Sequence, residues 1–325
     1  MAVAPLFGSD GESGKMLDAI QQQVQGVFEK SGPAVVRIEA TDTHGRLAGS
    51  GFFIDPNGTL YTSYSVGGES QDITVHFRGE RHQATRLVSD LRSGIALLKI
   101  EAQTPFVSFG KARELALATP VIALGYPMEM PLTPSFGIVG GFDGKYGGRF
   151  FATTHIRANL PVQRGESGAP LLNTKGEVVG ILISTLDNGS ASFVLPIEAA
   201  EKVRMDFIRF REVRPGWIGL AVKAADAPAA GSTALIDEVM AGSPAQKAGL
   251  TAGDILLQIG ARQISVPADV LDASFFLTAD DGVPVRVNRA GTEVQLEVQP
   301  ADPPTARRAS LPPAGVAPHG LKVGQ

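Results

Sequence analysis

Apolar residues recur along most of this chain in short runs that polar, glycine-rich segments separate. The first pattern differs, because its apolar positions repeat at the three- and four-residue spacing of a helix. These positions are Leu17, Ile20, Val24, Val27 and Phe28. We therefore predict a packing helix over residues 16–30, which ends at Ser31-Gly32-Pro33 because glycine favours a C-cap and proline cannot continue a helix.

Short apolar runs rich in Val, Ile, Leu and Phe then follow one another, which is typical of strands. We predict strands at residues 35–40, 48–55, 59–63, 73–77, 83–88, 95–100, 121–127, 136–139, 150–156, 177–185 and 192–195. The segment 78–80 is predicted to pair 73–77 with 83–88 as a hairpin, and the glycine-rich residues 140–144 to form another hairpin turn. About a dozen strands with turns every ~8–12 residues indicate an all-β sandwich or barrel.

A helical pattern at 196–210 and the polar, proline-ended segment 211–215 separate a second module from the first. Strand patterns at 235–239, 285–287 and 294–298 belong to this module. Residues 301–325 contain proline, alanine and charge with few large apolar side chains, which predicts a disordered tail. The predicted organisation is an N-terminal segment and helix (1–33), a β domain (34–210), a second domain (216–300) and a tail (301–325).

Composition narrows the function classes. With 325 residues, 43% of them hydrophobic and 19% charged, the chain is long enough for globular domains with a large core. A net charge of −4 gives no basic footprint, so we expect no nucleic-acid partner. No apolar run approaches the ~20 residues of a membrane span. The absence of cysteine excludes disulfides and thiol catalysis, and no metal-ligand motif such as His-Glu-x-x-His occurs, so neither a metal nor a cofactor is predicted.

The start of the chain has no basic region followed by an apolar stretch, so no signal peptide is visible. Either the protein is not exported or its numbering begins after a removed signal. These alternatives leave the compartment open.

Candidate chemistry centres on Arg164-Gly165-Glu166-Ser167-Gly168-Ala169-Pro170, on a loop between predicted strands. A serine between glycines suits a nucleophile, because glycine lets backbone N–H groups approach a bound carbonyl closely. An ordinary glycine-rich turn is the simpler interpretation of these residues alone.

The pattern Gly-x-Ser-Gly-x-Pro resembles the nucleophile loop of trypsin-like serine peptidases. Between about Gln21 and Gln299 the chain resembles a serine peptidase domain of the HtrA (Deg) branch of that superfamily, followed by one PDZ domain. The segments that carry this resemblance are Val35-Val36-Arg37-Ile38, Gly49-Ser50-Gly51-Phe52-Phe53-Ile54-Asp55, Ile95-Ala96-Leu97-Leu98-Lys99-Ile100 and Ser192-Phe193-Val194-Leu195-Pro196-Ile197. The resemblance implies a mostly β chain, with a trypsin-like double β-barrel followed by a PDZ domain, and an oxyanion hole formed by Gly165 and Ser167.

The catalytic triad of that family is incomplete here. Ser65 stands at the place of the histidine, Gly94 at the place of the aspartate, and only Ser167 matches. The loop also has Ala169 where the family has a second glycine. A serine is a poor nucleophile without a neighbouring base, and loss of a triad base lowers turnover by a factor on the order of 10⁶.

Other residues are weak candidates for the missing groups. The histidines are His44, His76, His82, His155 and His319. His155 is the nearest to Ser167 in the sequence, although a strand histidine is more often a surface or hydrogen-bonded residue. Asp90 is a weak candidate for the carboxylate, and we expect Glu166 to be a solvated loop carboxylate.

In the second module, Gly216-Trp217-Ile218-Gly219 matches the carboxylate-binding loop of HtrA-type PDZ domains. The segments 242–245 and 248–254 match the signature turn and helix of these domains. A PDZ domain adds an extended peptide to a sheet edge and holds its C-terminal carboxylate on loop N–H groups. The alternative is a PDZ domain that binds nothing and only packs on the barrels.

The leading hypothesis is a noncatalytic HtrA-like protein that binds polypeptides with apolar C-termini or unfolded segments, as a scaffold, a chaperone-like holder or a regulator. The rival is an active serine endopeptidase in protein quality control that uses Ser167 with an unusual base. Whether the chain is an enzyme therefore stays open. The resemblance also implies a homotrimer and a periplasmic or other extracytoplasmic location.

Overall fold

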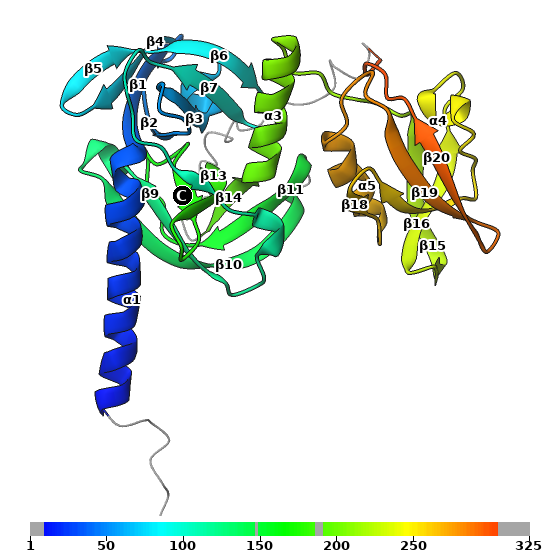
Figure 1. Ribbon diagram of the computed structural model, residues 1–325, viewed down its shortest axis with the longest axis horizontal. Coiled ribbons are helices and arrows are strands. Elements are labelled where there is room, and N and C mark those ends of the chain that lie inside the picture. The colour runs from blue at the N-terminus through cyan, green and yellow to red at the C-terminus, as the bar shows by residue number, and fades with distance from the viewer. Residues whose placement is uncertain (1–9, 147–148, 186–190, 305–325) are drawn as a thin grey trace, which may run out of the picture. The chain divides into compact units, whose positions relative to one another are not determined.

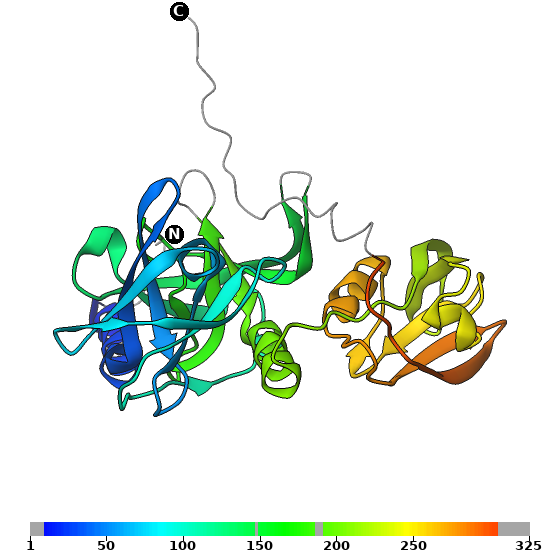
Figure 2. The ribbon, with the colours of Figure 1, turned by 90° about the horizontal axis from the view of Figure 1, so that it is seen from above.

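The computed structural model describes residues 10–146, 149–185 and 191–304. Its contacts divide into two compact units, one with residues up to Phe142 together with Ile156–Glu198, the other with Asp143–His155 and the chain from Ala199. Three β-sheets form the main secondary structure of the described residues, as Figures 1 and 2 show. The prediction of a mostly β chain is confirmed.

The helices of the structure are α1 (Asp10–Ser31), α2 (Tyr64–Gly67), α3 (Ile197–Phe210), α4 (Pro244–Lys247) and α5 (Pro267–Phe275), with short 3₁₀ turns at Gly32–Ala34, Ala112–Glu114 and Pro127–Glu129. The strands of the first unit are β1 (Val35–Asp42), β2 (Gly45–Phe53), β3 (Thr59–Ser63), β4 (Gln71–Phe77), β5 (Glu80–Gln83), β6 (Thr85–Asp90), β7 (Ile95–Lys99), β8 (Ser108–Phe109), β9 (Pro120–Gly125), β10 (Thr133–Tyr146), β11 (Arg149–Asn159), β12 (Pro170–Leu172), β13 (Glu177–Thr185) and β14 (Ser192–Pro196); the far ends of β10 and β11 belong to the second unit. The remaining strands are β15 (Leu220–Ala229), β16 (Ser232–Val239), β17 (Ile255–Ile259), β18 (Arg262–Gln263), β19 (Val283–Arg289) and β20 (Thr292–Val298).

The predicted helix at 16–30 is present as α1 and begins earlier than predicted. Its C-terminal half is fastened to the turn after β12, because Gln23, Lys30 and Ser31 donate to the carbonyls of Thr174, Lys175 and Gly176. Earlier in the helix, Leu17 and Ile20 are exposed. The predicted stop at Gly32 and Pro33 forms the 3₁₀ turn that leads into β1.

The first sheet has the strand order β5-β4-β1-β2-β3-β7-β6. The predicted hairpin between 73–77 and 83–88 is wrong, since β4 pairs with the short β5 whereas β6 pairs with β7. The reason is the tight turn at Arg78 and Gly79, whose φ angles are 51° and 80°, which returns the chain at once. The following strand is then free to pair at the other edge of the sheet.

The second sheet has the order β12-β9-β10-β11-β14-β13-β8, and the pair β12–β13 closes it. The predicted turn at 140–144 is wrong, because these residues lie inside β10. Gly140 and Gly141 have a packing reason instead: a Cβ at either position would overlap the side chain of Asn159 or Arg157 on β11. Glycine here makes room for long neighbours and does not reverse the chain.

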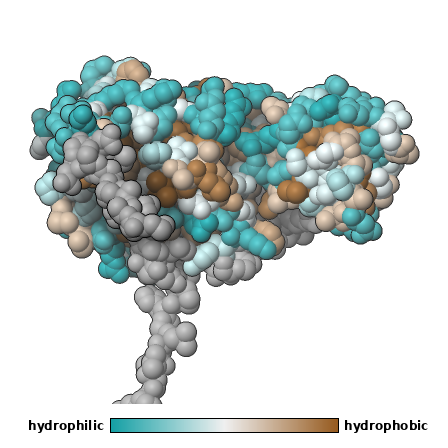
Figure 3. Space-filling model, turned by 90° about the horizontal axis from the view of Figure 1, so that it is seen from below, coloured by the Kyte–Doolittle hydropathy of each residue, from teal (hydrophilic) through white to brown (hydrophobic). Residues whose placement is uncertain are grey.

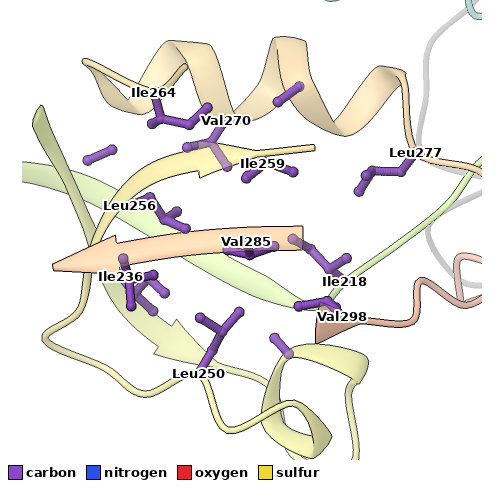
Figure 4. Packing of buried hydrophobic residues seen from close by; sticks show 14 residues of the cluster. Ile218, Ile236, Leu250, Leu256, Ile259, Ile264, Val270, Leu277, Val285 and Val298 are labelled. Atoms are coloured by element: carbon purple, nitrogen blue, oxygen red, sulfur yellow. The ribbon is translucent and has the colours of Figure 1, made fainter. Parts of the chain in front are cut away.

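The second unit contains most of the predicted helix α3 and a sheet with the path β15-β16-β17-β19-β20. A cluster of buried aliphatic side chains fills the space between this sheet and α5, and Figure 4 shows Ile218 beside Val298 within it. Ala301 exchanges backbone hydrogen bonds with Trp217, so the predicted tail begins with an ordered, strand-like residue. Residues 305–325 of that tail lie outside the described residues.

Candidate functional site

Ser167 lies on the loop that joins β11 to β12, and two glycines give this loop its shape. Gly165 and Gly168 have φ angles of 95° and 87°, in the left-handed region that side chains disfavour. A Cβ on Gly165 would overlap the Tyr126 carbonyl, and a Cβ on Gly168 would overlap the Ser50 carbonyl. The sequence therefore needs glycine on both sides of Ser167 for the loop to pack this closely.

Three serine hydroxyls meet at the end of β3 and form what we call the serine cluster: Ser63, Ser65 and Ser167. The Ser167 Oγ donates to Ser63 Oγ at 2.9 Å, and Ser65 Oγ lies 2.9 Å from Ser63 Oγ and 3.2 Å from Ser167 Oγ. Ser167 also has the Ile183 carbonyl at 3.4 Å. Thus the side chain beside the candidate nucleophile is a hydroxyl, which does not titrate near neutral pH.

Gly94 immediately precedes β7, and its backbone is bonded to Tyr64, the residue before Ser65. Its carbonyl accepts a hydrogen bond of 2.6 Å from Tyr64 N–H, and its φ angle is 78°. A Cβ at this position would lie 2.8 Å from Cγ2 of Ile183. The space beyond Gly94 is thus occupied by an aliphatic side chain, and an acidic residue there would have to displace it.

The backbone N–H groups of Gly165 and Ser167 are available to a ligand. In the described part of the chain neither donates to a protein acceptor. The carbonyl of Arg164 is held by Met128 N–H at 2.5 Å, and the carbonyl of Gly165 accepts from Ser50 Oγ at 2.8 Å. The Arg164 and Gly165 carbonyls are therefore bonded to groups outside the loop.

The segment that holds the Arg164 carbonyl is itself anchored by ion pairs. Met128 and Glu129 have positive φ angles, 48° and 62°. The Glu129 carboxylate lies 3.0 Å from an Arg46 nitrogen and 3.6 Å from an Arg37 nitrogen, on β2 and β1. A strained turn from the second sheet is in this way tied to the first sheet, close to the Ser167 loop.

Glu166 is not the solvated loop carboxylate that the sequence led us to expect. Its side chain is buried, one oxygen accepts from Gln163 N–H at 2.6 Å, and Oε1 has no partner in the described residues. Burial raises the pKa of the Glu166 carboxyl, against the opposing effect of the Gln163 hydrogen bond. The prediction failed because the tight loop turns this side chain inward, against Gly125.

His155 is the nearest candidate base in the sequence, and its surroundings suit a structural residue. The ring is buried, Nδ1 contacts the Thr153 carbonyl at 2.9 Å, and the ring centroid lies 4.3 Å from that of Phe151. Burial lowers the pKa of His155 to about 4. A base with this pKa is poorly matched to proton abstraction near neutral pH.

The other titratable candidates also have local partners. The Asp90 carboxylate accepts from Ser93 N–H at 3.0 Å and so caps the turn that leads to Gly94. His76 lies 3.0 Å from Glu39, and His44 and His82 lie beside Asp42 and Glu80. His319 lies outside the described residues. Over those residues, no group of acidic and histidine side chains is arranged to hold a metal ion.

The loop at residues 216–219 begins the second unit's sheet. Gly216 N–H donates to Leu277 O and Trp217 N–H to Ala301 O, so the backbone donors of these two residues are already engaged. Ile218 is buried in the core, and Gly219 has a φ angle of 80°. Among the residues the structure describes, the N–H groups of Ile218 and Gly219 have no acceptor. They precede β15, which is an edge strand of its sheet.

Two family models match the chain over these same regions. A model described as a trypsin-like peptidase domain matches residues 49–181, and one described as a PDZ domain matches residues 208–299. The chain carries a trypsin-like peptidase domain followed by a PDZ domain. The predicted fold class is therefore confirmed, and the predicted domain limits stay predictions.

Curated relatives are proteins named "probable periplasmic serine endoprotease DegP-like". The one from Hahella chejuensis is 31% identical over 83% of this chain and 61% of its own length. The one from Marinomonas sp. is 33% identical over 78% of this chain and 58% of its own length. The chain thus spans about three fifths of the length of these relatives.

Solved structures agree on the fold. The HtrA-type protease AlgW, solved with a tripeptide, has a TM-score of 0.71 at 23% identity and covers 87% of this chain and 98% of its own. A serine endoprotease from Yersinia pestis has a TM-score of 0.61 at 24% identity and covers 86% of this chain and 98% of its own. At these identities the likeness concerns the fold.

Sequence reasoning missed some residues that the structure brings to the site. Ser63 and Ile183 contact the candidate catalytic positions, and neither belongs to a motif that marks it. The position of Ser63 two residues before Ser65, at the end of a strand, was the available signal. No signal in the sequence indicates that Ile183 fills the space beside Gly94.

Proposed function

We propose that this chain is a noncatalytic member of the HtrA (Deg) branch that binds polypeptides through its PDZ domain and the cleft around Ser167. The observation that carries the proposal is the Ser65 hydroxyl, 3.2 Å from Ser167 Oγ, where a peptidase needs a base. A hydroxyl cannot take the serine proton at neutral pH and return it to a leaving amine.

The surroundings of Gly94 and His155 support the same proposal. A second triad residue is replaced by one without a side chain, and Ile183 lies against it. His155 is buried against Thr153 and Phe151, and burial lowers its pKa to about 4. Neither position supplies the proton transfer that the Ser167 hydroxyl lacks.

Peptide binding is the function that the remaining features support. In the PDZ domain, the free N–H groups of Ile218 and Gly219 precede the edge strand β15, which suits a bound C-terminus and an added strand. Exposed apolar residues of β10, Phe136 and Ile138, offer contact to unfolded segments. Figure 3 shows apolar side chains gathered among hydrophilic ones on the face seen from below.

The location and assembly that we propose for this chain are based on its relatives. Their printed names place them in the periplasm, and we propose an extracytoplasmic location for this chain as well. We also propose the homotrimer that the HtrA resemblance implies. No helix in the described residues is long and apolar enough to cross a bilayer.

The alternative function is that of an active serine endopeptidase. The relatives' names favour it, and the N–H groups of Gly165 and Ser167, which have no acceptor in the described residues, support it as candidate oxyanion donors. In this alternative a base other than a triad histidine activates Ser167.

One comparison separates the two functions. Purified protein and Ser167→Ala are incubated with casein and, separately, with a fluorophosphonate probe. We expect neither turnover nor labelling above the Ser167→Ala background. Casein cleavage that disappears in Ser167→Ala would establish the endopeptidase instead.

A second measurement tests peptide binding. Trp217 is the only tryptophan and its ring lies over Gly219, so its fluorescence reports on the carboxylate loop. Peptides with apolar C-termini are expected to change that fluorescence saturably. Unchanged emission at millimolar peptide would count against the PDZ part of the proposal.

A further inference from the structure

The serine cluster is a ring of hydrogen bonds with one weak edge. Each hydroxyl has a single proton and two acceptor lone pairs, so three hydroxyls can each donate once and accept once around a ring. Two edges measure 2.9 Å, and the edge between Ser65 and Ser167 measures 3.2 Å. Ser63 is buried whereas Ser65 is exposed. A ligand oxygen can therefore open the ring at Ser65, where the bond is longest and solvent has access.

The loop that carries Ser167 supplies further donors. The Gly165 and Ser167 N–H groups have no acceptor in the described residues. A triad histidine would present an acceptor nitrogen toward Ser167, but Ser65 presents an O–H that can donate. A serine at position 65 thus puts a further hydrogen-bond donor beside the Ser167 loop, where a triad histidine would put a base.

We propose that the serine cluster and the Gly165 and Ser167 N–H groups form a binding site for a free carboxylate, supplied by the C-terminus of a polypeptide. One carboxylate oxygen accepts from the two N–H groups and the other accepts from Ser65. This inference rests on the proposed noncatalytic function and specifies the ligand of its cleft. No covalent step is involved.

The chemistry favours a chain end over an internal peptide bond. A carboxylate has two oxygens that accept hydrogen bonds, which matches two sets of donors, the Ser65 hydroxyl and the loop N–H groups. An internal peptide group has one carbonyl oxygen, so it would leave one set of donors unused. Hydrogen bonds to a charged acceptor are also stronger than those to a neutral carbonyl.

The neighbouring carboxyl is directed into the protein. Glu166 is buried, and its side chain lies against Gly125. Its Oε2 accepts from Gln163 N–H on the buried side.

The test uses the full chain labelled with ¹⁵N-glycine and ¹⁵N-serine. The probes are N-acetyl-Ala-Ala-Leu with a free carboxylate and the same peptide as a carboxamide. The Gly165 and Ser167 N–H resonances report on this site separately from the PDZ domain. We expect the carboxylate peptide to shift both resonances saturably, with an affinity at least about tenfold above that of the carboxamide.

Variants identify the donor. Ser65→Ala is expected to weaken carboxylate binding by about tenfold, and Ser65→Thr, which keeps a hydroxyl, to bind like the native chain. Ser135→Ala on β10 is the matched control and is expected to leave binding unchanged.

Equal affinity for acid and amide, or native affinity in Ser65→Ala, would overturn the inference. If neither peptide shifts Gly165 and Ser167 while Trp217 still responds to peptide, this inference fails and the proposed PDZ function stands. Serine-dependent casein cleavage would remove the proposed function itself.

Discussion

Glu166 is a residue whose environment decides its chemistry. Its carboxyl is buried beside Ser167 with one hydrogen bond, from Gln163 N–H, and burial raises its pKa. A carboxyl with a raised folded-state pKa contributes most to stability below its unfolded pKa of about 4.3. That contribution is lost as the pH rises through the folded-state value, because the charged form is disfavoured in the loop.

Replacing Glu166 by glutamine should therefore remove part of the pH dependence of stability. We expect Glu166→Gln to be more stable than the native chain at pH 7, by about 1 kcal/mol, and the difference to shrink toward pH 4. Urea denaturation at several pH values measures it. Glu101→Gln, at an exposed glutamate, is the control and should follow the native profile. A constant difference at all pH values would contradict the assignment.

The surroundings of Gly94 bear on whether a catalytic triad can be restored by substitution at positions 65 and 94. We expect Ser65→His with Gly94→Asp to remain inactive on casein, because residue 94 has a φ of 78° and its Cβ would lie 2.8 Å from Ile183. The Gly94→Asp change alone should destabilise the chain by about 1–3 kcal/mol through backbone strain and overlap. Adding Ile183→Ala should recover part of that stability. Full activity of the double variant would show that the loop adapts freely.

At the scale of elements, one ion pair joins the turn before β17 to β19. Asp254 is buried, and its carboxylate accepts from Arg289 Nε at 2.7 Å and from Thr251 N–H at 3.0 Å. Burial by itself would raise the pKa of Asp254, but the hydrogen bonds from Arg289 and Thr251 outweigh it and lower the pKa. The pair therefore stabilises the PDZ domain above the unfolded pKa of about 3.9 and loses its effect as the pH falls through the folded-state value.

Replacing Arg289 tests the contribution of this ion pair. Arg289→Ala should destabilise the PDZ domain by about 1–3 kcal/mol at pH 7, a range reduced from that of a fully buried pair because Arg289 is partly exposed. The loss should fade in acid. Arg286→Ala on the same strand, which breaks a more exposed pair with Glu293, should cost less than about 1 kcal/mol. Equal losses for both variants would contradict the special role of Asp254.

At the scale of the molecule, the two units should respond separately to a PDZ ligand. Trp217 is the only tryptophan and belongs to the second unit, so tryptophan fluorescence follows the unfolding of that unit. A peptide at 100 times its Kd should raise the free energy of unfolding that the fluorescence reports by about 2.7 kcal/mol. In the Ser65→Ala variant, which weakens the proposed carboxylate site of the first unit, circular dichroism also reports the strands of that unit and should show a component that the peptide shifts less than the fluorescence transition. A single transition that shifts as a whole would indicate that the units unfold together.

Much of the fold could be predicted from local pattern. The helices α1 and α3 follow from apolar spacing, and most strands follow from short apolar runs between turns. Strand partners could not be predicted in this way, because pairing depends on contacts between distant segments. Two segments illustrate the limit. The tight turn at Arg78 and Gly79 sets the pairing of the short β5 with β4, and side chains on β11 explain why glycines occur inside β10.

The sequence by itself determined that Ser167 lies on a glycine-shaped loop and that no histidine or aspartate stands at positions 65 and 94. Residue identity is enough for these statements, because a hydroxyl and a hydrogen atom cannot transfer protons as imidazole and carboxylate do. Only the tertiary structure decided that Ser63 joins Ser65 and Ser167, that Ile183 occupies the space beside Gly94, and that Glu166 is buried. Those outcomes depend on how separate strands pack around one loop, and no local pattern records that packing.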